Sequence, residues 1–157
     1  MSITRRKVLG SGVGLGSIGL GAAVGGSSII AGTVASYASG AEEAIAAFTG
    51  GVKPGSGRIS LGTPQIAENG NTVPIKVSVE SPMSEADHVA EVLVVATGNP
   101  APGVVTFKFT VMSGKAAAST RIRLAKTQDL IAIAKMSDGS FFQDTKTVKV
   151  TIGGCGG

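Results

Sequence analysis

The sequence predicts an all-β protein with a short N-terminal helix and a flexible C-terminal arm. Three observations carry this prediction. Apolar and polar residues alternate along several segments after residue 57, turn-forming residues recur between them, and the chain ends in a stretch that is almost entirely glycine. A length of 157 residues suits a single domain.

Alternation of apolar and polar residues marks strands that bury one face. It runs through three segments, residues 73–79, 105–111 and 148–152. Two further segments, 92–95 and 130–133, are more continuously apolar, and shorter strands are expected at 58–61 and 120–124. About seven strands at intervals of roughly ten residues favour an immunoglobulin-like β-sandwich, with a small antiparallel barrel as the alternative.

The turns and the helix are marked by local signals. Turn-forming residues stand at 69–71, 81–82, 98–103, 113–114 and 138–139, and the Asp138-Gly139 pair predicts a tight hairpin. Residues 41–48 favour a helix, with Ser39 and Glu42 at capping-box spacing and Gly50-Gly51 at its end.

The first residues resemble an export signal. Arg5 and Arg6 precede an uncharged run from residue 8 to 41, which ends in small residues. A basic start, an apolar stretch and a small-residue cleavage site define such a signal, and the paired arginines favour the twin-arginine route to the periplasm. We expect a signal over 1–38 that is cleaved, a β-sandwich domain over 39–152 and an arm over 153–157. After cleavage we expect no membrane attachment; an uncleaved anchor is the alternative.

The remaining charges and side chains exclude several classes of function. Beyond residue 7 there are 11 basic and 10 acidic residues. This near balance does not indicate the basic surface that binds a nucleic acid. His88 is the only histidine, and Glu85, Asp87 and Glu91 beside it are better explained as a solvated loop than as a metal site. We predict no metal and no cofactor. Outward positive charge is expected at three positions, as a solvated face or an anion site: Arg121, Arg123 and Lys126.

The chain ends with its only cysteine, Cys155, between two pairs of glycines: Gly153, Gly154, Gly156 and Gly157. Glycine lacks a side chain to bury, so this segment is predicted to be mobile and extended, and narrow enough to enter the active site of another protein. An unpaired cysteine in an exported protein indicates a reactive thiol or an intermolecular disulfide. Cys155 is therefore the candidate site of covalent substrate attachment, with a disulfide-linked structural dimer as the alternative.

These features together resemble a known family. The ending Val-Thr-Ile-Gly-Gly-Cys-Gly-Gly, after a twin-arginine signal and a β-rich domain, is similar to the SoxY family, the sulfur carriers of the bacterial Sox thiosulfate-oxidising system. Residues 44–51, 120–129 and 138–141 also resemble segments of that family.

The resemblance implies a carrier and not an enzyme. It implies that Cys155 holds sulfur intermediates of thiosulfate oxidation while other proteins act on them. The implied partners are SoxZ in a heterodimer and, transiently, the c-type haem complex SoxAX, the dimanganese hydrolase SoxB and the sulfane dehydrogenase SoxCD. The cofactors belong to those partners.

Overall fold

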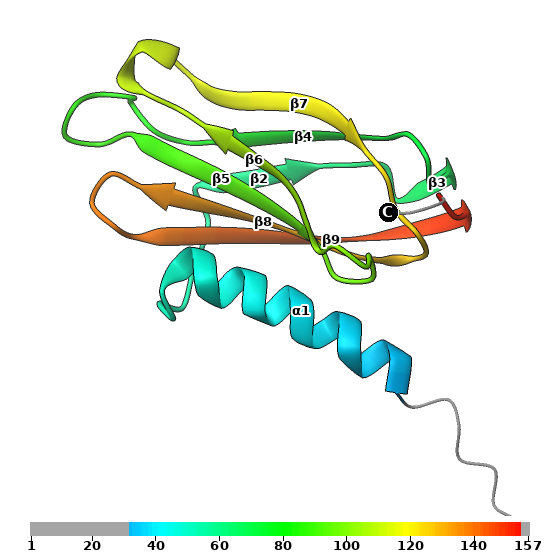
Figure 1. Cartoon of the computed structure of the whole chain (residues 1–157). Coiled ribbons are helices and arrows are strands. Elements are labelled where there is room, and N and C mark those ends of the chain that lie inside the picture. The colour runs from blue at the N-terminus through cyan, green and yellow to red at the C-terminus, as the bar shows by residue number, and fades with distance from the viewer. Residues whose placement is uncertain (1–31, 155–157) are drawn as a thin grey trace, which may run out of the picture.

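A computed structural model describes residues 32–154 of the chain, with side chains from Gly40 onward. It contains one long helix, α1 (Gly32–Thr49), followed by strands that form two facing sheets (Figure 1). The prediction of an all-β sandwich preceded by a helix is confirmed. Within residues 32–154, no helix combines the length and hydropathy needed to cross a membrane.

The larger sheet has six strands and the smaller has three. The larger follows the order β1-β9-β8-β5-β6, with β3 also paired to β9; the bounds are β1 (Gly55–Ser56), β3 (Ile66–Asn69), β5 (Val89–Ala96), β6 (Gly103–Lys108), β8 (Gln128–Met136) and β9 (Phe141–Ile152). The smaller follows the order β2-β4-β7, with bounds β2 (Ile59–Gly62), β4 (Val73–Val79) and β7 (Ala116–Ile122). A single 3-10 turn, η1 (Val111–Ser113), joins β6 to β7.

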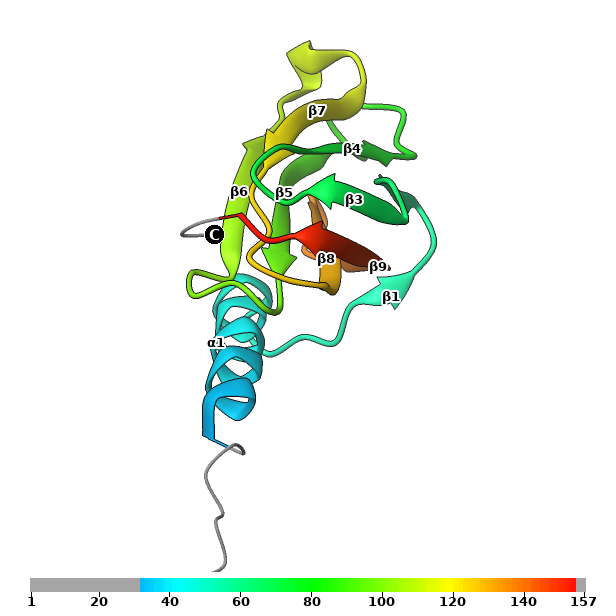
Figure 2. The same cartoon turned by 90° about the vertical axis from the view of Figure 1, so that its right-hand side faces the viewer.

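The strand β9 organises the end of the sandwich that carries the C-terminus. It pairs antiparallel with β8 along most of its length, and its last residues pair in parallel with β3, which faces it from residue 66 to residue 69 (Figure 2). The alternation at 148–152 therefore marks only the last part of a strand of 12 residues. The nine strands exceed the expected seven because β1 and β3 are too short to show a pattern of alternation.

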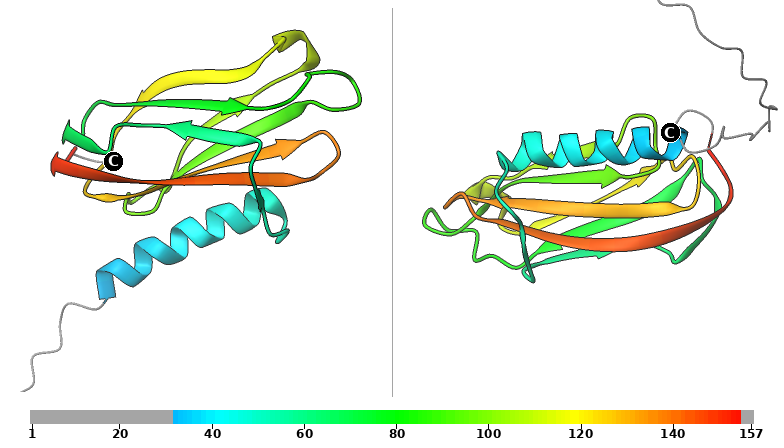
Figure 3. Two further views of the ribbon diagram at one scale, coloured as in Figure 1. Left: turned by 180° about the vertical axis from the view of Figure 1, so that it is seen from behind. Right: turned by 90° about the horizontal axis from the view of Figure 1, so that it is seen from below.

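Most of the core lies between the two sheets. Alternate residues of β4 face residues of β5 and β8 there, among them Val77, Val92 and Leu130. A second, smaller cluster lies under α1, where Ala41 packs with Leu93 and Val95. The strand β5 is covered by the other sheet on one face and by the helix on the other, which fits the continuously apolar sequence of its residues 92–96 (Figure 3).

The helix starts earlier than its sequence signals predict. A cap at Ser39 is contradicted, because helical backbone begins at Gly32 and Ser39 lies inside the helix. The small residues before Ser39 include no proline that would stop the helix from extending. Its end is as expected: Gly50 has φ +63°, and the Gly51 amide donates to the Ala46 carbonyl at 3.3 Å, as in a Schellman cap.

Candidate functional site: the root of the C-terminal arm

The residues with the most specific predicted roles lie outside the described part of the chain. These are Cys155, Gly156 and Gly157 in the arm and Arg5 and Arg6 in the export signal. The structure does describe the two residues from which Cys155 extends, Gly153 and Gly154. We call these two residues the arm root.

A chain of three backbone hydrogen bonds holds the arm root. The Gly70 amide donates to the Ile152 carbonyl at 2.7 Å, and the Leu124 amide donates to the Gly70 carbonyl at 2.8 Å. The Gly154 amide then donates to the Leu124 carbonyl at 2.9 Å. The turn before β4 and the segment after β7 therefore grip the end of the chain from two sides. We call Gly70 and Leu124 the clasp.

The glycines of the arm root make close backbone contacts. A Cβ atom added to Gly154 would lie 2.8 Å from the Gly70 carbonyl oxygen, and one added to Gly153 would collide with the Ala125 carbonyl oxygen. Gly154 is buried. Gly154 is therefore hydrogen-bonded and packed although it buries no side chain, whereas Gly153 is exposed. The mobility predicted for the arm over 153–157 stays a prediction.

A network of buried amide side chains holds the clasp in place. Asn99 is fully buried, and its Nδ2 donates to the Arg123 carbonyl at 2.9 Å. Its Oδ1 accepts from the Ala125 amide at 3.0 Å and from Gln128 Nε2 at 2.8 Å. Gln128 Oε1 accepts from the Gly98 amide at 2.7 Å. Asn99 thus fixes the residues on both sides of Leu124, and with them the carbonyl that holds Gly154.

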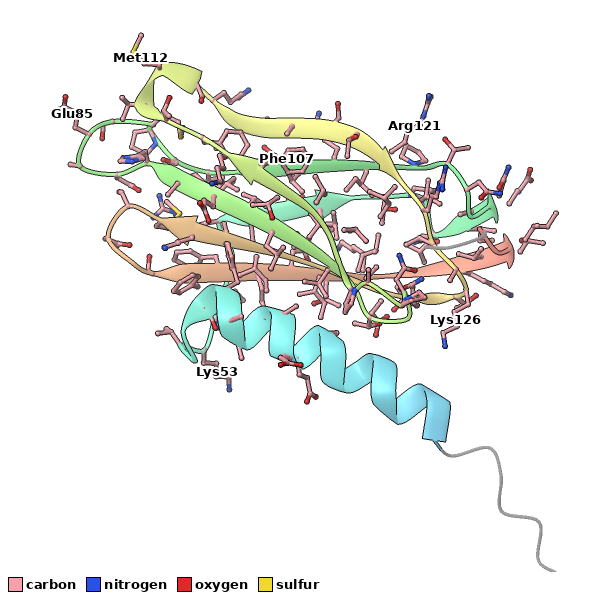
Figure 4. All side chains as sticks on the ribbon, in the orientation of Figure 1. Lys53, Glu85, Phe107, Met112, Arg121 and Lys126 are labelled. Carbon is pink, nitrogen blue, oxygen red and sulfur yellow. The ribbon has the colours of Figure 1, made fainter. Side chains whose placement is uncertain are left out.

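The cluster around His88 is built differently, at the opposite end of the sandwich, where the loop bearing Glu85 lies (Figure 4). His88 is half-buried, and its Nδ1 lies 3.0 Å from the Ser84 carbonyl oxygen. Asp87 accepts from Arg58 Nη2 at 2.8 Å and 2.9 Å through its two carboxylate oxygens. Glu91 pairs with a lysine of β6 at 3.7 Å. Among residues 32–154, no three side chains of His, Cys, Asp or Glu gather as metal ligands would.

The predicted positive face lies partly near the arm root. Arg121 and Arg123 are exposed and line a shallow pocket of about 420 Å³ between β6 and β7, together with Asn99. Arg121 also lines a second shallow pocket, of about 540 Å³, on the outer face of the small sheet. Lys126 is exposed beyond the end of β7, on the other side of the molecule from Arg121 (Figure 4). The three cations therefore do not converge on one site.

Sequence reasoning missed Gly70, Asn99 and Gln128. The first two lie in segments that the sequence predicts only as turns. A glycine and an asparagine in loops are the ordinary signals of a turn, and the residues they contact lie from 24 to 84 positions away in the chain. The close approach of Gly70 to the arm root has no local signal.

The chain matches a family and several solved structures. The family model for "Sulfur oxidation protein SoxY" matches residues 45–155. The sulfur carrier protein SoxY from Chlorobium limicola f thiosulfatophilum is 33% identical, with a TM-score of 0.59 over 73% of this chain and 99% of that chain. No curated protein sequence matches.

Superoxide reductases share the fold alone. The neelaredoxin from Ignicoccus hospitalis (E23A) is 18% identical, with a TM-score of 0.55 over 69% of this chain and 86% of that chain. The superoxide reductase from Nanoarchaeum equitans is 13% identical, with a TM-score of 0.52 over 61% of this chain and the whole of that chain. The 33% identity with the Chlorobium protein is well above the identities with the superoxide reductases. Together with the family match, it shows that this chain belongs to the SoxY family of sulfur oxidation proteins.

Proposed function

We propose that this protein carries sulfur intermediates of thiosulfate oxidation as covalent adducts of the Cys155 thiol. One observation carries the proposal: the family match extends to residue 155 and so includes the only cysteine of the chain. A relative of 33% identity is itself described as a sulfur carrier protein. The protein would act as a substrate-bearing subunit, with the catalysis supplied by its partners.

The position of the arm root supports this role. Gly154, the residue before Cys155, follows the end of β9 and lies against Gly70, in the turn before β4. The Cα atom of Cys155 follows that of Gly154 at about 3.8 Å. Cys155 therefore extends from a residue whose position is fixed by the domain. A carrier needs this arrangement, because its cargo must be reached by several enzymes in turn.

The chemistry needs an oxidant from outside the chain. Loading joins the Cys155 sulfur to the outer sulfur of thiosulfate, which forms Cys–S–S–SO₃⁻ and releases two electrons and the thiol proton. The two electrons go to a c-type haem acceptor, the role we assign to SoxAX. Hydrolysis then adds water, releases sulfate and two protons, and leaves Cys–S–S⁻ on the arm. We assign this step to SoxB, the oxidation of the remaining sulfur to SoxCD, and stable pairing to SoxZ.

The proposal includes export of the chain to the periplasm by the twin-arginine signal around Arg5 and Arg6. The proposed cleavage after Ala38 falls inside α1, but the side chains that pack the helix onto the sheet, Ala41, Ile45 and Phe48, all follow it. Cleavage would remove Tyr37, the only tyrosine of a chain without tryptophan. The mature protein should therefore barely absorb at 280 nm, and a tyrosine band in purified periplasmic protein would contradict cleavage after Ala38.

Substitution of Cys155 by serine tests the carrier role. With the partner proteins, thiosulfate and an electron acceptor present, we expect sulfate release to fall to background while the amide spectrum of residues 40–154 is unchanged. Sulfate release by the variant at the wild-type rate would reject the proposal. The loaded wild-type chain, analysed by intact-mass spectrometry without reductant, should be a single chain that carries its adduct on one thiol. If the active form were instead a disulfide-linked dimer, the structural alternative would hold.

A further inference from the structure

We propose that Gly70 is a positioning residue for Cys155, because the absence of a side chain at residue 70 lets the clasp hold the arm root. The inference rests on the proposed carrier role of Cys155. It concerns a residue 85 positions before the cysteine, in a turn that contributes no group to the arm itself. Its basis is the contact that Gly70 makes with both Leu124 and Gly154.

The conformation of the turn does not explain the glycine. Five glycines in the described chain have positive φ angles, as turns and helix ends require, and Gly70 is not among them. Its surroundings do explain it. A Cβ atom at residue 70 would collide with the Leu124 carbonyl oxygen and would lie 2.7 Å from the Gly154 nitrogen. These are the two atoms of the hydrogen bond that holds the arm root, so any side chain at residue 70 would separate them.

The clasp determines how far the thiol can move. With Gly154 held, the Cys155 Cα atom stays within about 3.8 Å of a fixed point. If the chain were free after Ile152, three residues would extend that range to about 10 Å. Misplacement of a reacting group by 1 Å can lower a rate substantially. A released arm would therefore present its sulfur to a loading enzyme less often in the required place.

Changes within the arm cannot test this inference by themselves. A side chain at residue 154 would disturb the clasp, since its Cβ would lie 2.8 Å from the Gly70 carbonyl oxygen, and it would also widen the arm that enters a partner. Gly70→Ala separates the two effects, because it leaves all five arm residues unchanged. Gly103→Ala is the matched control, since a Cβ there meets nothing within 4 Å and Gly103 has no positive φ.

The experiment compares the mature wild-type chain with Gly70→Ala and Gly103→Ala, each assembled with its partners for the loading assay. In wild type and in Gly103→Ala, we expect slow exchange of the Gly154 amide and equal kcat/KM for oxidative loading with thiosulfate. In Gly70→Ala, the Gly154 amide should exchange as in an unfolded peptide, and kcat/KM for loading should fall on the order of tenfold. Alkylation of Cys155 by iodoacetamide, which needs no positioning, should proceed equally in all three.

Two results would overturn the inference. One is a Gly154 amide that stays protected in Gly70→Ala, and the other is a released arm that is loaded at the wild-type rate. If Gly70→Ala does not fold, the wild-type chain decides the first point: a Gly154 amide that exchanges there as in an unfolded peptide would mean that the clasp does not hold the arm root, and the inference would fail. Absence of loading in the wild type would instead reject the carrier role, which separates failure of that proposal from failure of this one.

Discussion

The two ends of the sandwich are stabilised by different kinds of interaction. At the end that bears His88, charged side chains make the contacts. Arg58 donates to Asp87, and its guanidinium lies over the Phe142 ring, 5.5 Å from the ring centroid. Arg58 adopts φ +57°, an unusual conformation for a residue with a side chain. At the end that bears the arm, backbone groups and the buried Asn99 make the contacts, and glycines provide the space for them.

The difference bears on where the proposed sulfur chemistry takes place. The end with the histidine, the carboxylates and the arginine has the residue types of an active site, yet Arg58 is paired with Asp87 and the His88 ring lies against the Ser84 carbonyl. The arm end has almost no reactive side chain, and its geometry serves to hold the residue before Cys155. We infer that residues with reactive groups stabilise one end, while residues without them position the reactive group at the other.

Loss of Asn99 should have the largest effect on stability. Asn99→Ala leaves the Ala125 amide, the Arg123 carbonyl and the Gln128 amide group without their buried partner. Burial of unpaired polar groups is costly, so we expect the free energy of unfolding to fall by about 3 kcal/mol. Urea denaturation measures this, and amide exchange should show that Gly154 loses protection at the same time. An effect below about 0.5 kcal/mol would mean that the network does not hold the arm end.

A change at the charged end should have a smaller effect. Asp87→Asn weakens the pair with Arg58. The side chain of Arg58 is 31% exposed and that of Asp87 is 41% exposed. Exposed pairs contribute little because water screens them, so we expect a loss below about 1 kcal/mol. Loading of Cys155 with thiosulfate should remain at the wild-type rate. A loading defect in this variant, with a normal Gly154 amide, would show that the charged end takes part in the chemistry.

The smallest effect should come from the β8–β9 hairpin. The Ser140 hydroxyl and amide donate to Asp138 Oδ1 at 2.6 Å and 2.8 Å, and these bonds lower the pKa of Asp138. A lowered pKa stabilises the folded chain above the ordinary carboxyl range, and this stabilisation is lost as the pH falls through the lowered value. Ser140→Ala should raise the pKa of Asp138 towards its ordinary value, which a carboxyl NMR titration measures. An unchanged titration would contradict the role of Ser140.

The same contrast explains what the sequence could predict. Alternation located β4 and β9, and the Asp138-Gly139 pair located the hairpin, because each of these signals is carried by neighbouring residues. The short strands β1 and β3 have no such pattern, since each is defined by pairing with β9. The helix extends past its apparent cap at Ser39 because no residue there stops it.

At the site, chain position predicted the candidate thiol but not its support. A single cysteine between glycines is a local pattern, so the sequence alone is enough to predict the candidate thiol. The clasp joins residues 70, 124 and 154, which come together only after the two sheets pack. The sequence around Gly70 therefore indicates only a turn. Its contact with the arm root becomes visible only in the folded structure.

The central claim is that sulfur is carried at the arm end, on Cys155 itself. Trypsin cleaves after Lys149, so one peptide, residues 150–157, contains the only cysteine. After incubation of the purified protein with thiosulfate and its proposed partners, we expect this peptide to gain about 112 Da, with fragment ions that locate the addition on Cys155. Turnover of thiosulfate with this peptide unmodified at every time point would contradict the account.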